Sequence, residues 1–275
     1  MRAVAIATRW GLALTMLLGF AGISPALGEE EKAEGWGGHL ILGGLAVPDY
    51  EGSEDYGPAP LAAGKLSYDD YYIEARGPGL RANVLPGDLL PFGLEFGPAL
   101  SYRGGRDDVD NDRVDDLRNI DGTIEMGAFA KLYTDAGLLP GDEIAFEIEW
   151  LSDVGGEHDG TTISFGPSYS FQPWERVHLG ISASATYASG NYNDTYFGID
   201  ADNARRSGLS QYDADGGIKD VGLMVNAIYQ WNEHWGITGM AGITQLVGDA
   251  ADSPIVDDEG SATQAIVGAG LLFRF

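Results

Sequence analysis

The C-terminal stretch Thr263-Gln264-Ala265-Ile266-Val267-Gly268-Ala269-Gly270-Leu271-Leu272-Phe273-Arg274-Phe275 decides the fold of this chain. Counted back from the end, every second residue is apolar, from Phe273 through Leu271 to Ala265. The residues between them are smaller and more polar on average. A period of two residues predicts a β-strand with one apolar face.

A strand that ends on an aromatic residue resembles the terminal strand of bacterial outer-membrane barrels. Gly270, Phe273 and Phe275 stand at the matching positions. The resemblance implies that these three residues form an assembly signal, which the barrel-assembly machinery reads. The alternative is an ordinary core strand at the chain end, and other features of the sequence decide between the two.

The N-terminal segment has the layout of a secretory signal peptide. Arg2 and Arg9 precede an apolar stretch at residues 11–23, and Ala26-Leu27-Gly28 offers small residues where a signal peptidase cuts. The apolar run is shorter than the ~20 residues that a membrane-spanning helix needs. We therefore predict a signal peptide at residues 1–28 and one barrel domain at residues 29–275.

Charge and composition exclude several classes of protein. The chain has 42 acidic and 16 basic residues, a formal net charge of −26, and no cysteine. A surface that binds nucleic acid would need the opposite charge. Without cysteine the chain forms neither disulfides nor thiolate metal sites. Beyond residue 28 no segment is apolar enough for a transmembrane helix, so this part can cross a membrane only as a closed barrel.

The stretch from residue 142 to residue 151 alternates strictly between two faces. The apolar face is predicted to contact lipid and comprises Ile144, Phe146, Ile148 and Trp150. A soluble β-sandwich alternates as well. A dry core, however, does not accept the charged residues that fall on the inward faces, whereas a hydrated lumen does. The predicted lumen residues are Glu125, Lys131, Glu147 and Glu149.

The connections between the predicted strands alternate in length. Residues 104–121, 189–218 and 248–262 are long, whereas residues 172–176 and 232–234 are short. In outer-membrane barrels the long loops face outside and the short turns face the periplasm. We predict an all-β, antiparallel transmembrane β-barrel with short periplasmic turns and long acidic outer loops.

The number of strands depends on residues 71–85. The apolar positions switch from odd to even numbers across Gly77-Pro78-Gly79, which marks either a bulge in one strand or a tight turn between two. The first reading gives eleven strands and the second twelve. Because single-chain bacterial barrels have even numbers of strands, we predict about 12 strands, with 10 as the alternative.

Four blocks of sequence resemble the MltA-interacting protein (MipA)/OmpV family of outer-membrane proteins. The blocks lie at residues 49–56, 196–223, 235–256 and 273–275, and Gly248-Asp249-Ala250-Ala251-Asp252-Ser253-Pro254-Ile255-Val256 is the most specific. The resemblance implies a location in the outer membrane, in contact with lipid and lipopolysaccharide. It also implies a scaffold that brings a lytic transglycosylase together with a murein synthase. Other members resemble adhesins or permeability factors.

The acidic loop at residues 107–116 is a candidate for binding divalent cations. Asp108, Asp110 and Asp112 alternate as in calcium loops, but Arg113 and Asn119 stand where an EF-hand needs Gly and Glu. A loosely bound Ca²⁺ or Mg²⁺ remains the alternative to a solvated acidic loop, which is the usual role of such a charge run. We predict no cofactor.

Glu147 and Glu149 share one inward face, so they could select cations in a small pore. The favoured alternative is that lumen acids form ion pairs with Lys131, Arg103, Arg274 or Arg81. The histidines are scattered, at positions 39, 158, 178 and 234, and none is placed for a Ser-His pair at the outer rim. We therefore predict no enzyme and no catalytic residue. The functional hypotheses are a scaffold, a small cation-preferring pore, and an adhesin that uses residues 189–218.

Overall fold

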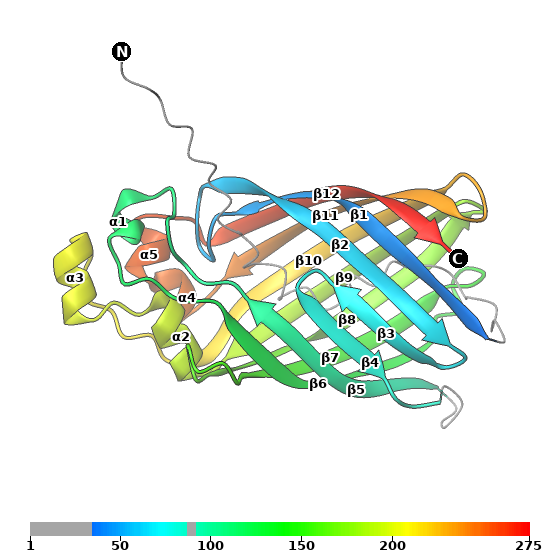
Figure 1. The fold of residues 1–275 in the computed structure, drawn as a ribbon, viewed down its shortest axis with the longest axis horizontal. Coiled ribbons are helices and arrows are strands. Elements are labelled where there is room, and N and C mark those ends of the chain that lie inside the picture. Colours follow the sequence, from blue (N-terminus) through cyan, green and yellow to red (C-terminus); the bar gives the residue numbers. More distant parts are fainter. Residues whose placement is uncertain (1–34, 87–91) are drawn as a thin grey trace, which may run out of the picture.

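The computed structural model describes residues 35–86 and 92–275, and the predicted signal peptide lies outside this part. These residues form one closed antiparallel barrel of twelve strands (Figure 1). The strands are β1 (Trp36–Pro48), β2 (Tyr56–Tyr68), β3 (Tyr71–Arg76), β4 (Gly79–Asn83), β5 (Gly93–Arg103), β6 (Thr123–Asp135), β7 (Glu143–Asp153), β8 (Thr161–Trp174), β9 (Val177–Ala188), β10 (Gly217–Gln230), β11 (Trp235–Leu246) and β12 (Thr263–Arg274).

Each strand pairs with its neighbour in the sequence, and the C-terminal strand β12 closes the ring against β1. The closing register sets Ile41 opposite Leu272 and Gly43 opposite Gly270. Closure gives the backbone groups of both edge strands a partner, which lipid does not supply. The predicted barrel of twelve strands is confirmed, and the alternative of ten is wrong.

Residues 71–83 form a short hairpin and not one bulged strand. Arg76 pairs with Gly79, so Gly77 and Pro78 make a two-residue turn between β3 and β4. Gly77 has a φ of 58°, a left-handed conformation that favours glycine. The tight turn explains why the apolar positions change from odd to even numbers at this point.

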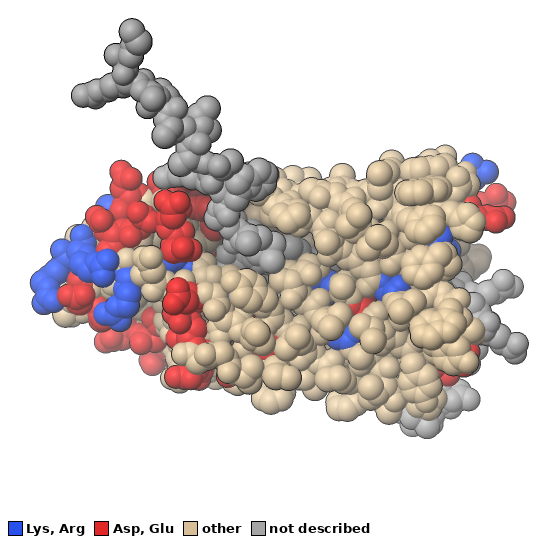
Figure 2. Space-filling model, viewed as in Figure 1, with Lys and Arg blue, Asp and Glu red and all other residues tan. Residues whose placement is uncertain are grey.

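The lipid-facing surface follows the predicted alternation. In β7 the side chains of Ile144, Phe146, Ile148 and Trp150 are exposed, while Ala145 and Glu147 between them are buried. Figure 2 shows the result on one side of the molecule: the barrel wall is largely free of charge, and acidic and basic residues gather at the end that carries the helices. In the described part of the chain, no helix is long and apolar enough to cross a membrane.

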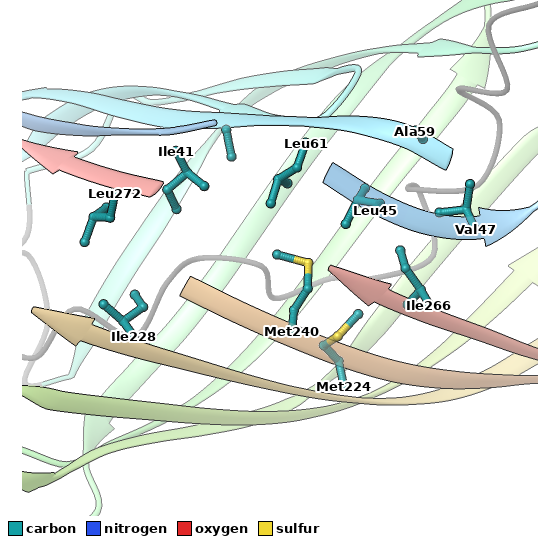
Figure 3. Packing of buried hydrophobic residues seen from close by; sticks show 11 residues of the cluster. Ile41, Leu45, Val47, Ala59, Leu61, Met224, Ile228, Met240, Ile266 and Leu272 are labelled. Atoms are coloured by element: carbon teal, nitrogen blue, oxygen red, sulfur yellow. The ribbon is translucent and has the colours of Figure 1, made fainter. Parts of the chain in front are cut away.

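The barrel interior is apolar on one side and charged on the other. The inward side chains of β1, β2, β10, β11 and β12 form an apolar cluster (Figure 3): Ile41, Leu45, Val47, Ala59, Leu61, Ala63, Met224, Ile228, Met240, Ile266 and Leu272. The expectation of a polar lumen therefore holds only for the side lined by β3 to β9. In β1 and β2 Gly, Ala, Leu and Pro are frequent on both faces, so the alternation carried little information there.

The long loops fold into an ordered cap over one end of the barrel (Figure 1). In the described residues they contain the helices α1 (Asp112–Asp115), α2 (Gly190–Phe197), α3 (Ala201–Ser207), α4 (Asp249–Asp252) and α5 (Pro254–Asp257). Two buried apolar clusters hold the helices together, one around Tyr192 and Phe197 and one around Leu117 and Ile255. We call this end the outer end, because long loops of such barrels face outside. The sequence predicted the loops but not their helices.

The assignment of faces can be tested with a single charge. Ile148→Arg places a guanidinium among lipid chains, which should lower the free energy of unfolding by about 2–4 kcal/mol. Ser168→Arg, on the inward face of the neighbouring strand β8, is the matched control and should cost less. Urea titration of the protein refolded into liposomes, followed by tryptophan fluorescence, measures both. Equal losses would contradict the assignment.

Candidate functional site

An ion-pair ladder crosses the charged side of the barrel interior. The guanidinium of Arg81 on β4 binds Glu74 on β3 at 2.6 Å and Glu147 on β7 at 2.8 Å. Arg76 binds the second oxygen of Glu147 at 3.1 Å. The side chain of Arg81 is 3% exposed and lies over the ring of Phe129. The ladder therefore ties the short β3–β4 hairpin to β7 through the interior.

The predicted lumen residues all face inward, and most are engaged in ion pairs. Glu125 receives two hydrogen bonds from Arg103, at 3.0 and 3.1 Å. Lys131 binds Glu143 at 2.9 Å, and Glu147 belongs to the ladder. Glu149 lies on the same inward face of β7 as Glu147. Arg274, which the sequence offered as a partner for these acids, has no hydrogen-bond partner at Nε or Nη2.

A second polar network joins the cap to the barrel wall. Lys219 on β10 binds Glu51 from the β1–β2 loop and, at 2.5 Å, Asp220. The hydroxyl of Tyr192 on α2 donates to Glu51 at 2.8 Å and accepts from Arg103 at 2.8 Å. Tyr192 is fully buried. Segments more than 100 residues apart therefore meet in one network beneath α2.

The charges of this network hold Glu51 in its ionised form. Burial by itself would raise the pKa of the Glu51 carboxyl, but the positive charges of Lys219 and Arg103 outweigh burial. The pKa of Glu51 is therefore below its ordinary value of 4.5. Burial also raises the pKa of the Tyr192 hydroxyl, which stays protonated and can donate to Glu51.

Polar side chains fasten the cap at three further points. Ser253 donates to the carbonyl of Phe197 at 2.6 Å, and Arg106 donates to the carbonyl of Tyr196 at 2.7 Å. Gln264 on β12 accepts from the backbone N–H of Gly52 at 3.2 Å. Most of these residues belong to the sequence blocks at 49–56, 196–223 and 235–256. The structure brings these blocks together in the cap, which the sequence alone did not predict.

The candidate cation loop does not assemble a metal site. Asp112 is the first residue of α1, whose N-cap is Asn111, and the backbone N–H of Asp110 donates to Asp49. Across residues 35–86 and 92–275, no group of three or more His, Asp or Glu side chains is placed to hold a metal ion. Asp108, Asp110 and Asp112 therefore lie in one loop without converging on one point.

The histidines have separate environments. His158 lies in the β7–β8 loop, as the sequence indicated, but it is buried beneath α2, with its ring edge-on to Tyr192. Its Nδ1 accepts from the N–H of Gly160, and its Nε2 lies 3.2 Å from Glu125. Nδ1 is thus occupied by a structural contact, and Nε2 is buried beside the Glu125 carboxylate. His234 lies in the β10–β11 turn at the opposite end.

The closed ring, the apolar outer wall and the contrast between short turns and long loops define an outer-membrane β-barrel. The chain belongs to the family described as MltA-interacting protein MipA, which matches residues 40–275. The family resemblance seen in the sequence is thereby confirmed, and the location in the outer membrane follows from both findings.

Curated relatives agree with the family. The outer membrane protein OmpV of Vibrio cholerae is 27% identical over 216 residues, which cover 75% of this chain and 74% of that protein. The putative outer membrane protein YiaT of Escherichia coli K12 is 35% identical over 101 residues, 36% of this chain and 39% of that protein. Among solved structures, OmpT of Vibrio cholerae has a TM-score of 0.42 at 7% identity, covering 87% of this chain and 96% of that one.

The contact between Lys219 and Glu51 can be tested by removing one partner. Lys219→Met leaves the carboxylates of Glu51 and Asp220 without their shared cation, which should destabilise the cap by about 3–5 kcal/mol. Hydrogen exchange of residues 190–216 reports the loss, and Lys219→Met/Glu51→Gln/Asp220→Asn should recover most of it. The control is Arg205→Met, which breaks the exposed pair of Arg205 with Asp202 and should change exchange little. Equal effects of Lys219→Met and Arg205→Met would contradict the role of the network.

The depressed pKa of Glu51 predicts a pH dependence. A carboxyl whose pKa is lower in the folded state stabilises that state above its unfolded pKa, and the stabilisation is lost as the pH falls through the folded value. We expect a nitroxide on Asn191→Cys in α2 to stay immobile from roughly pH 8 to pH 5. Its mobility should rise only below pH 4.5, as the pH falls through the lowered pKa of Glu51. The same change in Glu51→Gln would show that another group is responsible.

Proposed function

We propose that this protein is a non-catalytic scaffold of the outer membrane that docks a murein lytic transglycosylase, and with it a murein synthase, at its periplasmic end. The observation that carries the proposal is the match of residues 40–275 to a family described by its interaction with MltA. A docking role requires a rigid surface on the side where murein lies, which in this fold is the end with the short turns.

The closed outer end supports a role on the periplasmic side. The cap covers the outer end with packed helices, and the ladder around Arg81 crosses the interior below it. Two of the predicted lumen acids bind cationic side chains: Glu125 binds Arg103, and Glu147 binds Arg76 and Arg81. Paired carboxylates offer little attraction to a passing cation. The geometry therefore favours the scaffold over the cation-preferring pore.

Two periplasmic turns present rigid, exposed side chains. In the β6–β7 turn the carboxylate of Asp142 accepts from the backbone N–H groups of Gly137, Leu138 and Leu139 at 2.9–3.1 Å. This fixed loop leaves the side chain of Leu138 75% exposed. At the end of β8, Trp174 is 68% exposed beside the turn at Glu175. Preorganised apolar and aromatic residues are what interface hot spots use.

The β10–β11 turn is also held in one shape. The side chain of Asn232 accepts from the backbone N–H groups of His234 and Trp235 at 2.9 and 2.8 Å. His234 Nδ1 contacts the carbonyl of Arg274 on β12 at 3.1 Å. The turn is thus tied to the closing strand. It forms, with the turns at Leu138 and Trp174, the docking surface of the proposal.

The proposal is tested by binding of a purified MltA-type lytic transglycosylase to the protein in nanodiscs, measured by biolayer interferometry. Leu138→Ser and Trp174→Ala should each weaken binding roughly 10- to 100-fold, as hot-spot residues do. Arg205→Ser on α3, at the opposite end, is the control and should leave the affinity unchanged. The scaffold proposal fails if the unaltered protein does not bind, or if Arg205→Ser weakens binding as much as the turn variants.

A further inference from the structure

The wall of the barrel is interrupted along one edge of β2. On one side β2 pairs with β1 over its full length, from Tyr56 to Tyr68. On the other side it pairs with β3 only from Ala63 to Tyr68. No strand of the described residues lies against the remaining edge, Tyr56–Leu61. We call this segment the open edge.

The interruption arises because the β3–β4 hairpin is short. β3 has 6 residues and β4 has 5, whereas their neighbours β2 and β5 have 13 and 11. Two backbone hydrogen bonds mark where the hairpin ends: the N–H of Gly77 donates to the carbonyl of Ala62 on β2, and the N–H of Tyr102 on β5 donates to the carbonyl of Pro78. Beyond this level β2 continues for six residues, about 20 Å at the usual rise of a strand.

The open edge lies within the outer leaflet of the membrane. Tyr56 and Tyr68 stand at the two ends of β2 with exposed side chains, as the aromatic girdles at the two membrane surfaces require. Tyr56 marks the outer surface and Tyr68 the periplasmic one. Pro58 and Pro60, between Tyr56 and the middle of the strand, therefore contact the lipid of the outer leaflet.

The sequence removes the hydrogen-bond donors that an open edge would leave without partners. Successive residues of an antiparallel strand direct their backbone N–H and C=O groups to opposite neighbours. The carbonyl of Ala62 accepts from Gly77 and so faces the hairpin side, whereas the carbonyl of Asp55 accepts from Asp49 in the loop that continues β1. Pro58 and Pro60 are four and two positions before Ala62, so their backbone groups point to the same side of the strand as those of Ala62. Both prolines therefore stand on the open edge, where their missing N–H groups leave no donor facing lipid at these two positions.

The open edge borders the apolar side of the barrel interior. Ala59 and Leu61 alternate with the two prolines, point inward and are 6% and 3% exposed. Figure 3 shows them in one cluster with Leu45 and Met240. An apolar surface inside the barrel thus begins directly behind the interruption of its wall, while the outer end is covered by the cap.

We propose that the open edge is a lateral opening, through which an apolar molecule of lipid-chain chemistry, dissolved in the outer leaflet, enters the apolar side of the barrel interior. The cap closes the axial route from outside, so the lateral route is the one that the fold leaves to such a molecule. A second β-strand is not the occupant, because two prolines on the edge cannot donate to it. The opening is a property separate from the docking surface at the periplasmic turns.

The first test compares two inward positions of the same apolar cluster. The chain has no cysteine, so Leu61→Cys and Met240→Cys each provide a single site for an environment-sensitive fluorophore. Met240 is the matched control, because β11 is paired on both edges. In liposomes of brominated phosphatidylcholine, the fluorophore at position 61, directly behind the open edge, should be quenched more strongly than that at position 240. Absence of quenching at position 61 would overturn the opening.

The second test follows entry of an apolar molecule. A diazirine-bearing fatty acid is added to liposomes that contain the protein, light is applied, and mass spectrometry locates the adducts. Adducts are expected on the inward Met240. Ala59→Trp, which fills the space behind the open edge, should abolish them. Ala145→Trp, which adds the same volume on the charged side, should not.

Folding of both tryptophan variants is verified by β-sheet circular dichroism in the same liposomes. Adducts on Met240 that persist in folded Ala59→Trp would overturn the lateral route, as would adducts confined to lipid-facing side chains in the unaltered protein. If Ala59→Trp does not fold, the quenching of position 61 against position 240 decides the proposal.

Discussion

The requirement that each backbone N–H and C=O group within lipid has a partner governs this structure. The ring meets it by pairing β12 with β1, and the closing contact is reciprocal: Gly38 donates to Phe275 at 3.1 Å and Phe275 donates to Gly38 at 3.0 Å. At the open edge the chain meets the donor half of this requirement by a different means, because proline has no N–H to satisfy. The last aromatic residue of the chain and the prolines of β2 thus serve one physical need.

The outer wall is uniformly apolar, so the features particular to this chain lie in the barrel interior. Charged residues are concentrated on the side of the short hairpin, where Arg81 and Arg76 link β3 and β4 to β7. This linkage compensates for the few backbone pairs that join β4 to β5, which span only Gly79 to Arg81. On the opposite side β1, β10, β11 and β12 are long and paired along both edges, and their inward side chains are apolar. Ionic cross-links therefore lie on the side that contains the two short strands, and dispersion packing dominates on the other side.

The faces of a strand could be predicted from the sequence only where neighbouring residues differ clearly in polarity. β7 was predictable, because Phe146 and Glu147 differ strongly in polarity. β1 and β2 were not, because Gly, Ala and Leu are frequent on both faces, and the apolar side of the interior was missed for that reason. The cap helices have at most 8 residues, too few to show a helical period. Start signals were present at Asn111 before α1, Asp200 before α3 and Ser253 before Pro254 of α5, but each precedes a helix of only one or two turns. The contact of Lys219 with Glu51 joins residues 168 positions apart and follows from the fold alone.

The cap and the open edge depend on each other. A strand with one unpaired edge would separate from the wall more readily than its neighbours, so the outer end of β2 needs other attachments. The loop that leads into β2 supplies them: Gly52 donates to Gln264, and Glu51 binds Lys219. Gly52 has a φ of 98°, and a Cβ there would lie 2.5 Å from Val256 of α5, so the loop fits against the cap only with glycine at this position. The hydroxyl of Tyr56 adds a bond to the backbone of Ala265 at 2.9 Å. Residues of the blocks that identify the family therefore hold the outer end of β2 in place. The barrel can be stable although its wall is interrupted beside this strand.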